Sequence, residues 1–310
     1  MAIDKAAYLA SEGFSRDFGS VSDDSSLIVA VQKEACHATC KSRTEKSRRT
    51  LGFITKIKKP TFVHLFRTAT ESLEKSMSNT PNIILVHGAW GDASHWRHVI
   101  PLLHEREFRV FAVQNPLTSL SEDIDRTSKL AAAQEGPTLL VGHAYGCAVI
   151  TGAGHTENVI GLVYLAGPAL DEGESLKNLQ ARGAPPPGAA NIRQDRYGFL
   201  WIAPEKFHET FCHDLVDQTE SLVWALTQKP TAVRCFEEPS GTPAWRVKPS
   251  WYQISANDRL IQPETERWMA ERINARRTIT LQTSHASIAT HPKEIVMLIE
   301  EASTALSGAN

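Results

Sequence analysis

The sequence carries almost no net charge and lacks long apolar runs. Its 33 Lys and Arg residues nearly balance its 35 Asp and Glu residues, which gives a formal net charge of −2. A near-neutral chain gives no electrostatic reason to expect nucleic acid or a membrane surface as a partner. The longest apolar run near the N-terminus, Leu27 to Val31, is far shorter than the ~20 residues that a membrane-spanning helix needs. Residues 1–19 contain acids and no apolar stretch, so no secretory signal is predicted.

Cysteine is also scarce, and no cofactor motif is present. The five cysteines are an odd number without the spacing of a disulfide framework. Cys36, His37 and Cys40 lie close together, but no second ligand pair follows at metal-site spacing, so no zinc site is predicted. The glycine patterns of dinucleotide and P-loop sites are absent. We therefore expect a soluble, cytoplasmic protein with free thiols and with no metal or cofactor.

The chain changes character near residue 80. Residues 1–79 show no clear alternation of strands and helices, and residues 41–60 contain eight Lys or Arg and one Glu. Such a stretch can be a nuclear-localisation or nucleic-acid patch, but no interleaved aromatic residues support this, and a solvated arm is favoured. Residues 61–76 have the pattern of one amphipathic helix. We predict an N-terminal extension over 1–79, partly disordered or helical, and a main domain over 80–310.

Strands alternate with helices in the main domain. Apolar segments typical of buried strands occupy 82–88, 108–117, 138–144, 158–170, 250–256 and 277–285. Helical patterns occupy 93–106, 120–134 (with Ser121 as the candidate N-cap), 145–154, 262–275 and 292–306. This alternation predicts an α/β fold with a mostly parallel sheet of about six strands and helices on both faces.

Residues 171–249 interrupt the alternation. They begin as a loop with a Pro-rich break at 185–188, and helical patterns follow at about 205–215 and 217–228. An insertion after the carboxyl end of a strand is where a lid would cover a site at the sheet edge. We predict a helical lid, and we take Trp90, Trp201 and Trp224 as candidates for an apolar substrate pocket. The aromatic residues fit the lid's own core equally well.

The stretch Gly142 to Gly146, GHAYG, directly follows the apolar run 138–141. It has the form of a nucleophile elbow, in which a Gly-x-nucleophile-x-Gly turn joins a buried strand to a helix. Gly142 and Gly146 would permit the sharp turn, because side chains there would collide with the neighbouring strand and helix. The nucleophile position carries Ala144, which has no reactive atom. Cys147 lies one helical turn further on and points away from the apex, so a catalytic thiol is not favoured.

Polar residues that could complete a catalytic triad follow two later strands. The order of position 144, Asp258 and His285 is the order of nucleophile, acid and histidine in α/β-hydrolases. His285 would act as general base and Asp258 would hold its tautomer. The backbone N–H groups of Tyr145 and Ala89 would stabilise an oxyanion. Taken singly, Asp258 fits a turn and His285 a surface histidine, but their joint placement favours the triad scaffold.

Two further histidines are expected to have supporting roles. We expect His143 to pack within the elbow. His87 follows the first strand, and we expect it to hold the oxyanion loop rather than to transfer protons.

Residues 82–310 resemble the small, esterase-like α/β-hydrolases that lack extra domains. The resemblance does not extend to residues 1–79 and is carried by VHGAWGDASHW, VGHAYG, YLAGPALDEGES, PEKFHETF, EPSGTPAW, PSWYQISANDRLIQPETERWMAERI and SHASIATHP. It implies the α/β-hydrolase fold and a carboxylic ester hydrolase with a Ser-His-Asp mechanism. The family pattern has Ser-Tyr-Gly-Gly where this chain has Ala144-Tyr145-Gly146-Cys147, so the chain departs at two positions, and the first is the nucleophile.

The alanine allows three interpretations. It is an engineered or recent loss of the serine, a natural loss that leaves a binding or regulatory protein, or a sign of chemistry that needs only His285, Asp258 and the oxyanion hole. The survival of these residues together favours the first. A lyase, a C–C hydrolase or a transferase would reuse the same triad. We expect a small apolar or aromatic ester-like substrate. We expect no activity on activated esters from the chain as it stands. The sequence does not indicate an oligomeric state.

Overall fold

The computed structural model describes residues 80–307. The predictions for the extension over 1–79 lie outside the described residues. They include the basic stretch 41–60, the cysteines at 36 and 40 and the helix over 61–76.

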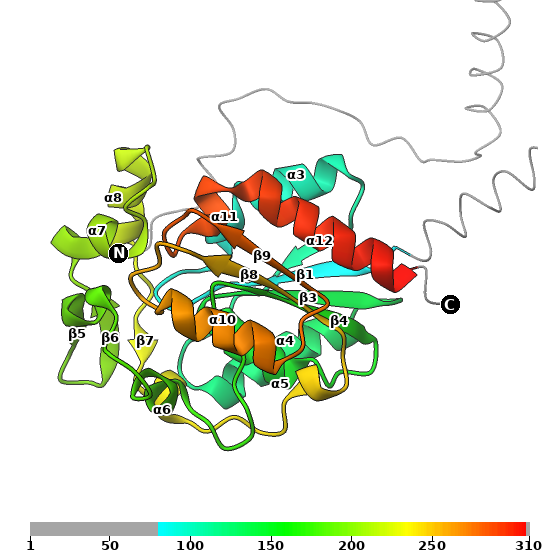
Figure 1. Ribbon diagram of the computed structural model, residues 1–310, viewed down its shortest axis with the longest axis horizontal. Helices are drawn as coiled ribbons and strands as arrows, with labels where there is room; N and C mark the ends of the chain where they lie inside the picture. Colours follow the sequence, from blue (N-terminus) through cyan, green and yellow to red (C-terminus); the bar gives the residue numbers. More distant parts are fainter. Residues whose placement is uncertain (1–79, 308–310) are drawn as a thin grey trace, which may run out of the picture. The chain divides into compact units, whose positions relative to one another are not determined.

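A six-stranded parallel sheet forms the centre of the described chain (Figure 1). Its order is β2-β1-β3-β4-β8-β9, and every neighbouring pair is parallel. The strands are β1 (Asn82–Val86), β2 (Val110–Ala112), β3 (Thr138–His143), β4 (Val159–Leu165), β8 (Ser250–Ser255) and β9 (Arg277–Leu281). The predicted α/β fold with about six strands is confirmed, and each predicted strand segment contains one strand.

Helices cover both faces of the sheet (Figure 1). One face carries α3 (Val99–Glu105) and α12 (Pro292–Ser307), and the other carries α4 (Leu120–Ala132), α5 (Tyr145–Ala153) and α10 (Pro263–Arg272). Successive side chains of a strand point to opposite faces. Accordingly, Ile83 and Leu85 of β1 join the core under α3 and α12, whereas Ile84 and Val86 join the core under α5 and α10. This double coverage explains the continuous apolar strands of the sequence.

Two predicted helix boundaries are corrected. The helix predicted over 93–106 is divided into a 3-10 helix η2 (Ala93–Trp96) and α3. Pro101 lies in the first turn of α3, where a missing N–H costs no helical hydrogen bond. The N-cap of α4 is Ser119 and not Ser121, because Ser119 is extended and its hydroxyl accepts a hydrogen bond of 3.2 Å from the Glu122 N–H.

The insertion (residues 171–249) combines helices with a second small sheet. It contains α6 (Leu176–Gln180), η3 (Pro187–Asn191), β5 (Ile192–Gln194), β6 (Phe199–Ile202), η4 (Pro204–Lys206), α7 (Phe207–Phe211), α8 (Gln218–Leu226), β7 (Thr231–Ala232), α9 (Arg234–Glu237) and η5 (Ala244–Arg246). Helices α7 and α8 lie within the helical segments predicted at about 205–215 and 217–228, and strands β5, β6 and β7, which pair antiparallel, were not predicted. Strands this short are missed because they leave no readable period of alternation. In Figure 1 the insertion lies beside the carboxyl ends of the main strands.

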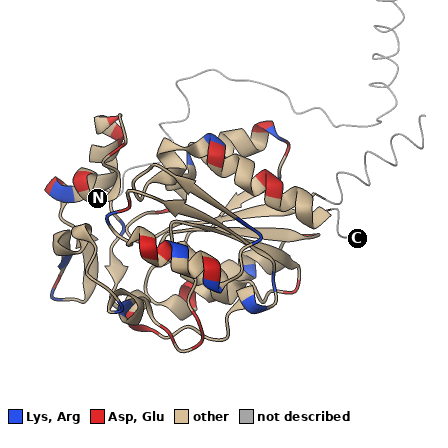
Figure 2. Ribbon diagram, in the orientation of Figure 1, with Lys and Arg blue, Asp and Glu red and all other residues tan. Residues whose placement is uncertain are grey.

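Charged residues lie mostly on the helices and loops around the sheet (Figure 2). Strands β1, β3 and β4 contain no Lys, Arg, Asp or Glu. Between residues 80 and 307, no helix is long and apolar enough to cross a membrane.

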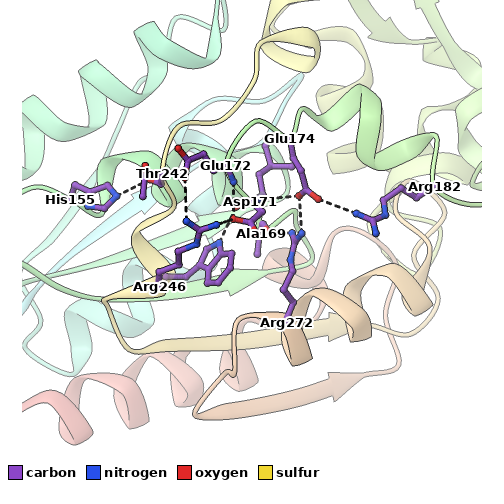
Figure 3. A network of polar contacts seen from close by, with 11 residues as sticks. His155, Ala169, Asp171, Glu172, Glu174, Arg182, Thr242, Arg246 and Arg272 are labelled. Carbon is purple, nitrogen blue, oxygen red and sulfur yellow. Dashed lines mark hydrogen bonds and ion pairs between the residues drawn. The ribbon is translucent and has the colours of Figure 1, made fainter.

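A network of ion pairs ties the start of the insertion to α10 (Figure 3). Glu174 pairs with Arg272 of α10 at 2.8 Å and with Arg182 at 3.0 Å. The guanidinium carbons of Arg272 and Arg182 lie 4.3 Å and 4.4 Å from the ring centre of Trp268. Arg272 also donates a hydrogen bond to the Ala169 carbonyl. These contacts fix the position of α6, which follows Glu174 directly.

We expect Arg272→Met to lower the free energy of unfolding by about 2 kcal/mol, because charged hydrogen bonds to partly buried partners are lost. Urea unfolding measures the change. Arg267→Met on the same helix is the matched control: Arg267 pairs with Glu264 in solvent, where such a pair contributes no more than about 0.5 kcal/mol. Equal effects of the two variants would show that the network does not hold the insertion.

Candidate active site

The turn between β3 and α5 is strained at Ala144. Its φ of 52° and ψ of −126° lie in a region that residues with a side chain rarely occupy. The Ala144 N–H donates to the Leu165 carbonyl at 3.0 Å, and the Ala144 carbonyl accepts from the Cys147 N–H at 2.9 Å. Such a conformation costs about 1–3 kcal/mol and persists only where the surroundings enforce it.

The two glycines of the elbow leave no room for side chains. A Cβ on Gly142 would lie 2.6 Å from the Gly146 carbonyl oxygen, at the start of α5. A Cβ on Gly146 would lie 2.2 Å from the Val86 carbonyl oxygen of β1. Side chains at these two positions would therefore collide, as the sequence predicted. Their absence allows helix α5 to approach the sheet so closely.

Asp258 and His285 form a buried pair. The His285 Nδ1–H donates to Asp258 Oδ2 at 2.5 Å, and the two side chains are nearly inaccessible to solvent. The other oxygen, Oδ1, accepts from the N–H groups of Leu260 at 2.7 Å and Ile261 at 3.0 Å. Asp258 therefore stabilises a turn with Oδ1 and holds the imidazole of His285 with Oδ2. No described residue is hydrogen-bonded to Nε2 of His285, the nitrogen left to accept a proton.

Two backbone amides are available beside the elbow. The Tyr145 N–H is the first of α5, and the Ala89 N–H follows β1. Among the described residues, neither amide donates to a carbonyl or a side chain. Both residues line the same cavity as His285. Free N–H groups at a helix N-terminus suit an anionic oxygen.

The cavity at the elbow has a volume of about 80 Å³ and is largely apolar. It is lined by Ala89, Trp90, Ala144, Tyr145, Pro168, Leu176, Leu179, Gln180, Gly183, Ala184, Pro186, Ile192, Phe236, Leu260, Ile261, Gln262, Thr265 and His285. This lining contains no Asp, Glu, Lys or Arg side chain. His285 supplies its one imidazole, and burial raises the pKa of Tyr145 well above its usual range.

Of the three predicted pocket tryptophans, the structure brings only Trp90 to this cavity. Its Nε1–H donates to the Leu200 carbonyl at 3.0 Å, which fixes the ring. Trp224 is buried elsewhere in the insertion, where it stacks on His95 with ring centres 4.5 Å apart. Trp201 packs against the hydrophobic core that lies under α4, α5 and α10. Trp201 and Trp224 therefore belong to the packing of the insertion, the alternative that the sequence left open.

A sequence model described as "Alpha/beta hydrolase family" matches residues 83–298. The chain belongs to the alpha/beta hydrolase family. The alpha/beta hydrolase nvfD of Aspergillus novofumigatus is 26% identical over 243 residues, which cover 72% of this chain and 96% of that protein.

Solved structures share the fold of this α/β-hydrolase. A pyrethroid hydrolase from Sphingobium faniae JZ-2 superposes with a TM-score of 0.63 at 21% identity, over 73% of this chain and 98% of its own. The Arabidopsis methylesterase MES16 superposes with a TM-score of 0.60 at 19% identity, over 73% of this chain and 100% of its own. At these identities the likeness shows the fold.

The two supporting histidines lie where the sequence placed them. His87 Nδ1–H donates to the Gly88 carbonyl at 2.9 Å, and its Nε2 accepts from the Asn115 N–H at 3.1 Å. Burial lowers the pKa of His87 to about 4, so the ring is neutral and holds the loop before Ala89. His143 donates from Nε2 to the His285 carbonyl at 2.8 Å, which joins the elbow to the loop that carries His285.

The sequence did not reveal the partner of Tyr145. Its hydroxyl donates to Asp123 Oδ2 at 2.6 Å, and Asp123 Oδ1 accepts from the Leu117 N–H at 3.0 Å. Burial raises the pKa of Asp123. Asp123 follows the N-cap of α4 and looks like an ordinary first-turn acid, so no sequence signal marks it. The pair anchors Tyr145, whose N–H is one of the two free amides.

Cys147 is not available as a substitute nucleophile. Its thiol is fully buried and donates to the Gly142 carbonyl at 3.0 Å. Burial raises the pKa of this thiol well above its usual range, which keeps it protonated. Within residues 80–307, no three His, Cys, Asp or Glu side chains are arranged to hold a metal ion.

Buried neutral histidines make stability depend on pH. Burial, with a smaller contribution from the charge of His87, lowers the pKa of His95 from 6.5 to about 3. Between these values the unfolded chain binds the proton and the folded chain does not, so acidification favours unfolding. We expect His95→Phe, which keeps the stacked ring, to remove up to about 1.4 kcal/mol per pH unit from this dependence.

Urea unfolding of the full chain between about pH 5 and pH 6.5 measures this slope. His104→Gln, which removes an exposed histidine of α3, is expected to leave the slope unchanged. A slope unaltered by His95→Phe would contradict a neutral, buried His95.

Proposed function

We propose that this protein has the site of a carboxylic ester hydrolase with a Ser-His-Asp mechanism, and that Ala144 disables it. The proposal rests on one observation: Ala144 at the apex of the elbow, His285, and the two residues with free N–H groups line a single cavity. Asp258 lies behind His285 at hydrogen-bond distance. These are the parts that the mechanism needs, except for the nucleophilic oxygen.

A serine at position 144 would supply that oxygen. His285 Nε2 would take the hydroxyl proton as the oxygen attacks the ester carbonyl, and Asp258 would stabilise the imidazolium. The N–H groups of Ala89 and Tyr145 would bind the oxyanion. The imidazolium would then protonate the leaving alkoxide, and water would release the acid by the reverse sequence of proton transfers. With alanine, no acyl-enzyme forms.

The lining favours a small, uncharged ester with apolar or aromatic groups. A carboxylate buried among Trp90, Phe236 and Leu179 would lose its hydration without an ionic partner, which costs several kcal/mol. The insertion supplies much of this wall, through α6 and through Phe236 of α9. We infer that it acts as the lid of the site. The names of two similar proteins, a pyrethroid hydrolase and a methylesterase, agree with a hydrolytic role.

A panel of aryl esters of graded acyl length tests the proposal on the Ala144→Ser variant beside the unchanged chain. We expect hydrolysis by the variant alone, and preference for neutral esters over matched esters with a terminal carboxylate. Soaking the alanine chain with the best ester should then trap the intact substrate.

A second candidate function is ligand binding without hydrolysis. It is favoured by Ala144 itself, because the strained elbow and the cavity are retained without the reactive atom. If the serine variant binds apolar esters but stays inactive on all of them, this candidate replaces the first. Lyase or C–C bond hydrolysis by the same triad would appear as turnover of substrates that the ester panel lacks.

A further inference from the structure

The cavity contains acid–base groups that do not depend on residue 144. Nε2 of His285 has no hydrogen-bond partner among the described residues, and its tautomer is fixed by Asp258. The N–H groups of Ala89 and Tyr145 are free on the same cavity. Ala144 and His285 line the same cavity, and the methyl group of Ala144 cannot donate a hydrogen bond to Nε2, as a serine hydroxyl would.

A base and oxyanion donors in an apolar site are sufficient for one class of reaction, removal of a proton from the carbon next to a carbonyl. The base must not be hydrogen-bonded to a competing hydroxyl, and the carbonyl oxygen must reach the donors as its charge develops. The first condition is met, because no described residue is hydrogen-bonded to Nε2 of His285, and the second is favoured because Ala89 and Tyr145 line the same cavity with free N–H groups.

We propose that the chain as it stands catalyses reversible proton transfer at the α-carbon of small neutral ketones and other carbonyl compounds. His285 Nε2 takes the proton as the C–H bond breaks. The bonding pair forms the C=C bond of the enolate, and the carbonyl π pair moves to the oxygen, which the Ala89 and Tyr145 N–H groups bind. The imidazolium, stabilised by Asp258, returns the proton to the same carbon or to the γ-carbon of an unsaturated ketone.

The step is balanced within the site. No water is consumed, no covalent bond to the protein forms and no oxidant or reductant is needed. The apolar lining favours it, because the ligand enters uncharged and the negative charge develops only where the two amides lie.

Deuterium exchange tests this directly. The full chain is incubated in D₂O with 4-phenylbutan-2-one, a neutral aryl ketone, and loss of its α-proton signals is followed by NMR while saturation-transfer difference spectra measure binding. We expect exchange at least about tenfold faster than in buffer, saturating with ketone concentration.

Matched variants assign the exchange to His285. His285→Asn is expected to reduce exchange to the buffer rate, because its amide can still donate to Asp258 but cannot accept the proton. His104→Gln, at an exposed position on α3, should leave exchange unchanged. Saturable binding without exchange above the His285→Asn level, or no saturable binding, would overturn the proposal.

The serine variant separates this proposal from the hydrolase proposal. In Ala144→Ser the hydroxyl would donate to Nε2, so exchange should fall while ester hydrolysis appears. If the alanine chain exchanges the α-protons and the serine variant does not hydrolyse esters, proton transfer is supported and the hydrolase proposal is contradicted. If the serine variant hydrolyses esters and the alanine chain does not exchange the α-protons, the hydrolase proposal is supported and proton transfer is contradicted.

Discussion

Ala144→Ser is expected to hydrolyse activated neutral esters roughly 10⁶-fold faster than the unchanged chain, which is the order of the loss when a serine hydrolase loses its nucleophile. The single added oxygen would sit at the apex of an elbow whose backbone is already in the required conformation. It would face His285 and the two free amides on the same cavity. Initial rates with p-nitrophenyl butyrate measure the gain.

A double variant controls for contaminating esterases. Ala144→Ser combined with His285→Asn should return to the rate of the unchanged chain, because the hydroxyl then has no base. If the single and double variants hydrolyse the ester equally, the activity does not come from the proposed triad.

Asp258→Asn in the Ala144→Ser background is expected to lower kcat by about 10⁴-fold, with little change in KM. The amide retains the shape of the carboxylate, and its oxygen can still accept from the Leu260 and Ile261 N–H groups. Its NH₂ group would then face His285 and favour the wrong tautomer, with the proton on Nε2. Steady-state kinetics with the same ester separate kcat from KM.

Asp214 provides the matched control for this effect. Its carboxylate accepts from the Thr283 hydroxyl at 2.8 Å and from the Ser284 N–H at 2.9 Å, directly before His285 in the chain, but it does not touch the imidazole. Asp214→Asn is expected to change kcat by less than about tenfold. Equal losses in the two variants would mean that Asp258 acts only by holding the loop.

The sequence predicted the parts of the molecule that have a short-range cause. The strands covered on both faces left continuous apolar runs, and the elbow left two glycines at a fixed spacing around Ala144. Asp258 and His285 were found because strand ends of a parallel sheet meet at one edge. Chain order and strand placement together predicted that these two side chains would be paired.

Other features depend on contacts between distant segments and could not be predicted. The strands of the insertion are too short to show alternation, and β7 pairs with β6 from a distant part of the insertion. Trp224 and Trp90 have the same chemistry, and only packing shows that Trp90 lines the cavity while Trp224 stacks on His95. The Asp123–Tyr145 contact joins α4 to the elbow across 22 positions of sequence.

The strain at Ala144 bears on the history of the site. An alanine gains nothing chemically from φ of 52°, yet the surrounding hydrogen bonds and the close approach of α5 to β1 hold it there. Tyr145, the next residue, has a free N–H group and lines the cavity. Under the proposed mechanism the elbow would still hold one oxyanion donor without a nucleophile, and His285 with Asp258 would remain as the acid–base pair.

The most direct test of the central claim, that this is a hydrolase site complete except for one oxygen, is covalent labelling. Ala144→Ser and the unchanged chain are treated with diethyl p-nitrophenyl phosphate, which transfers a diethylphosphoryl group to an activated serine, and the peptides are analysed by mass spectrometry. The account predicts one label per chain, on the serine introduced at position 144, blocked by His285→Asn and absent from the alanine chain. No label at that position, or an equal label on the alanine chain, would contradict it.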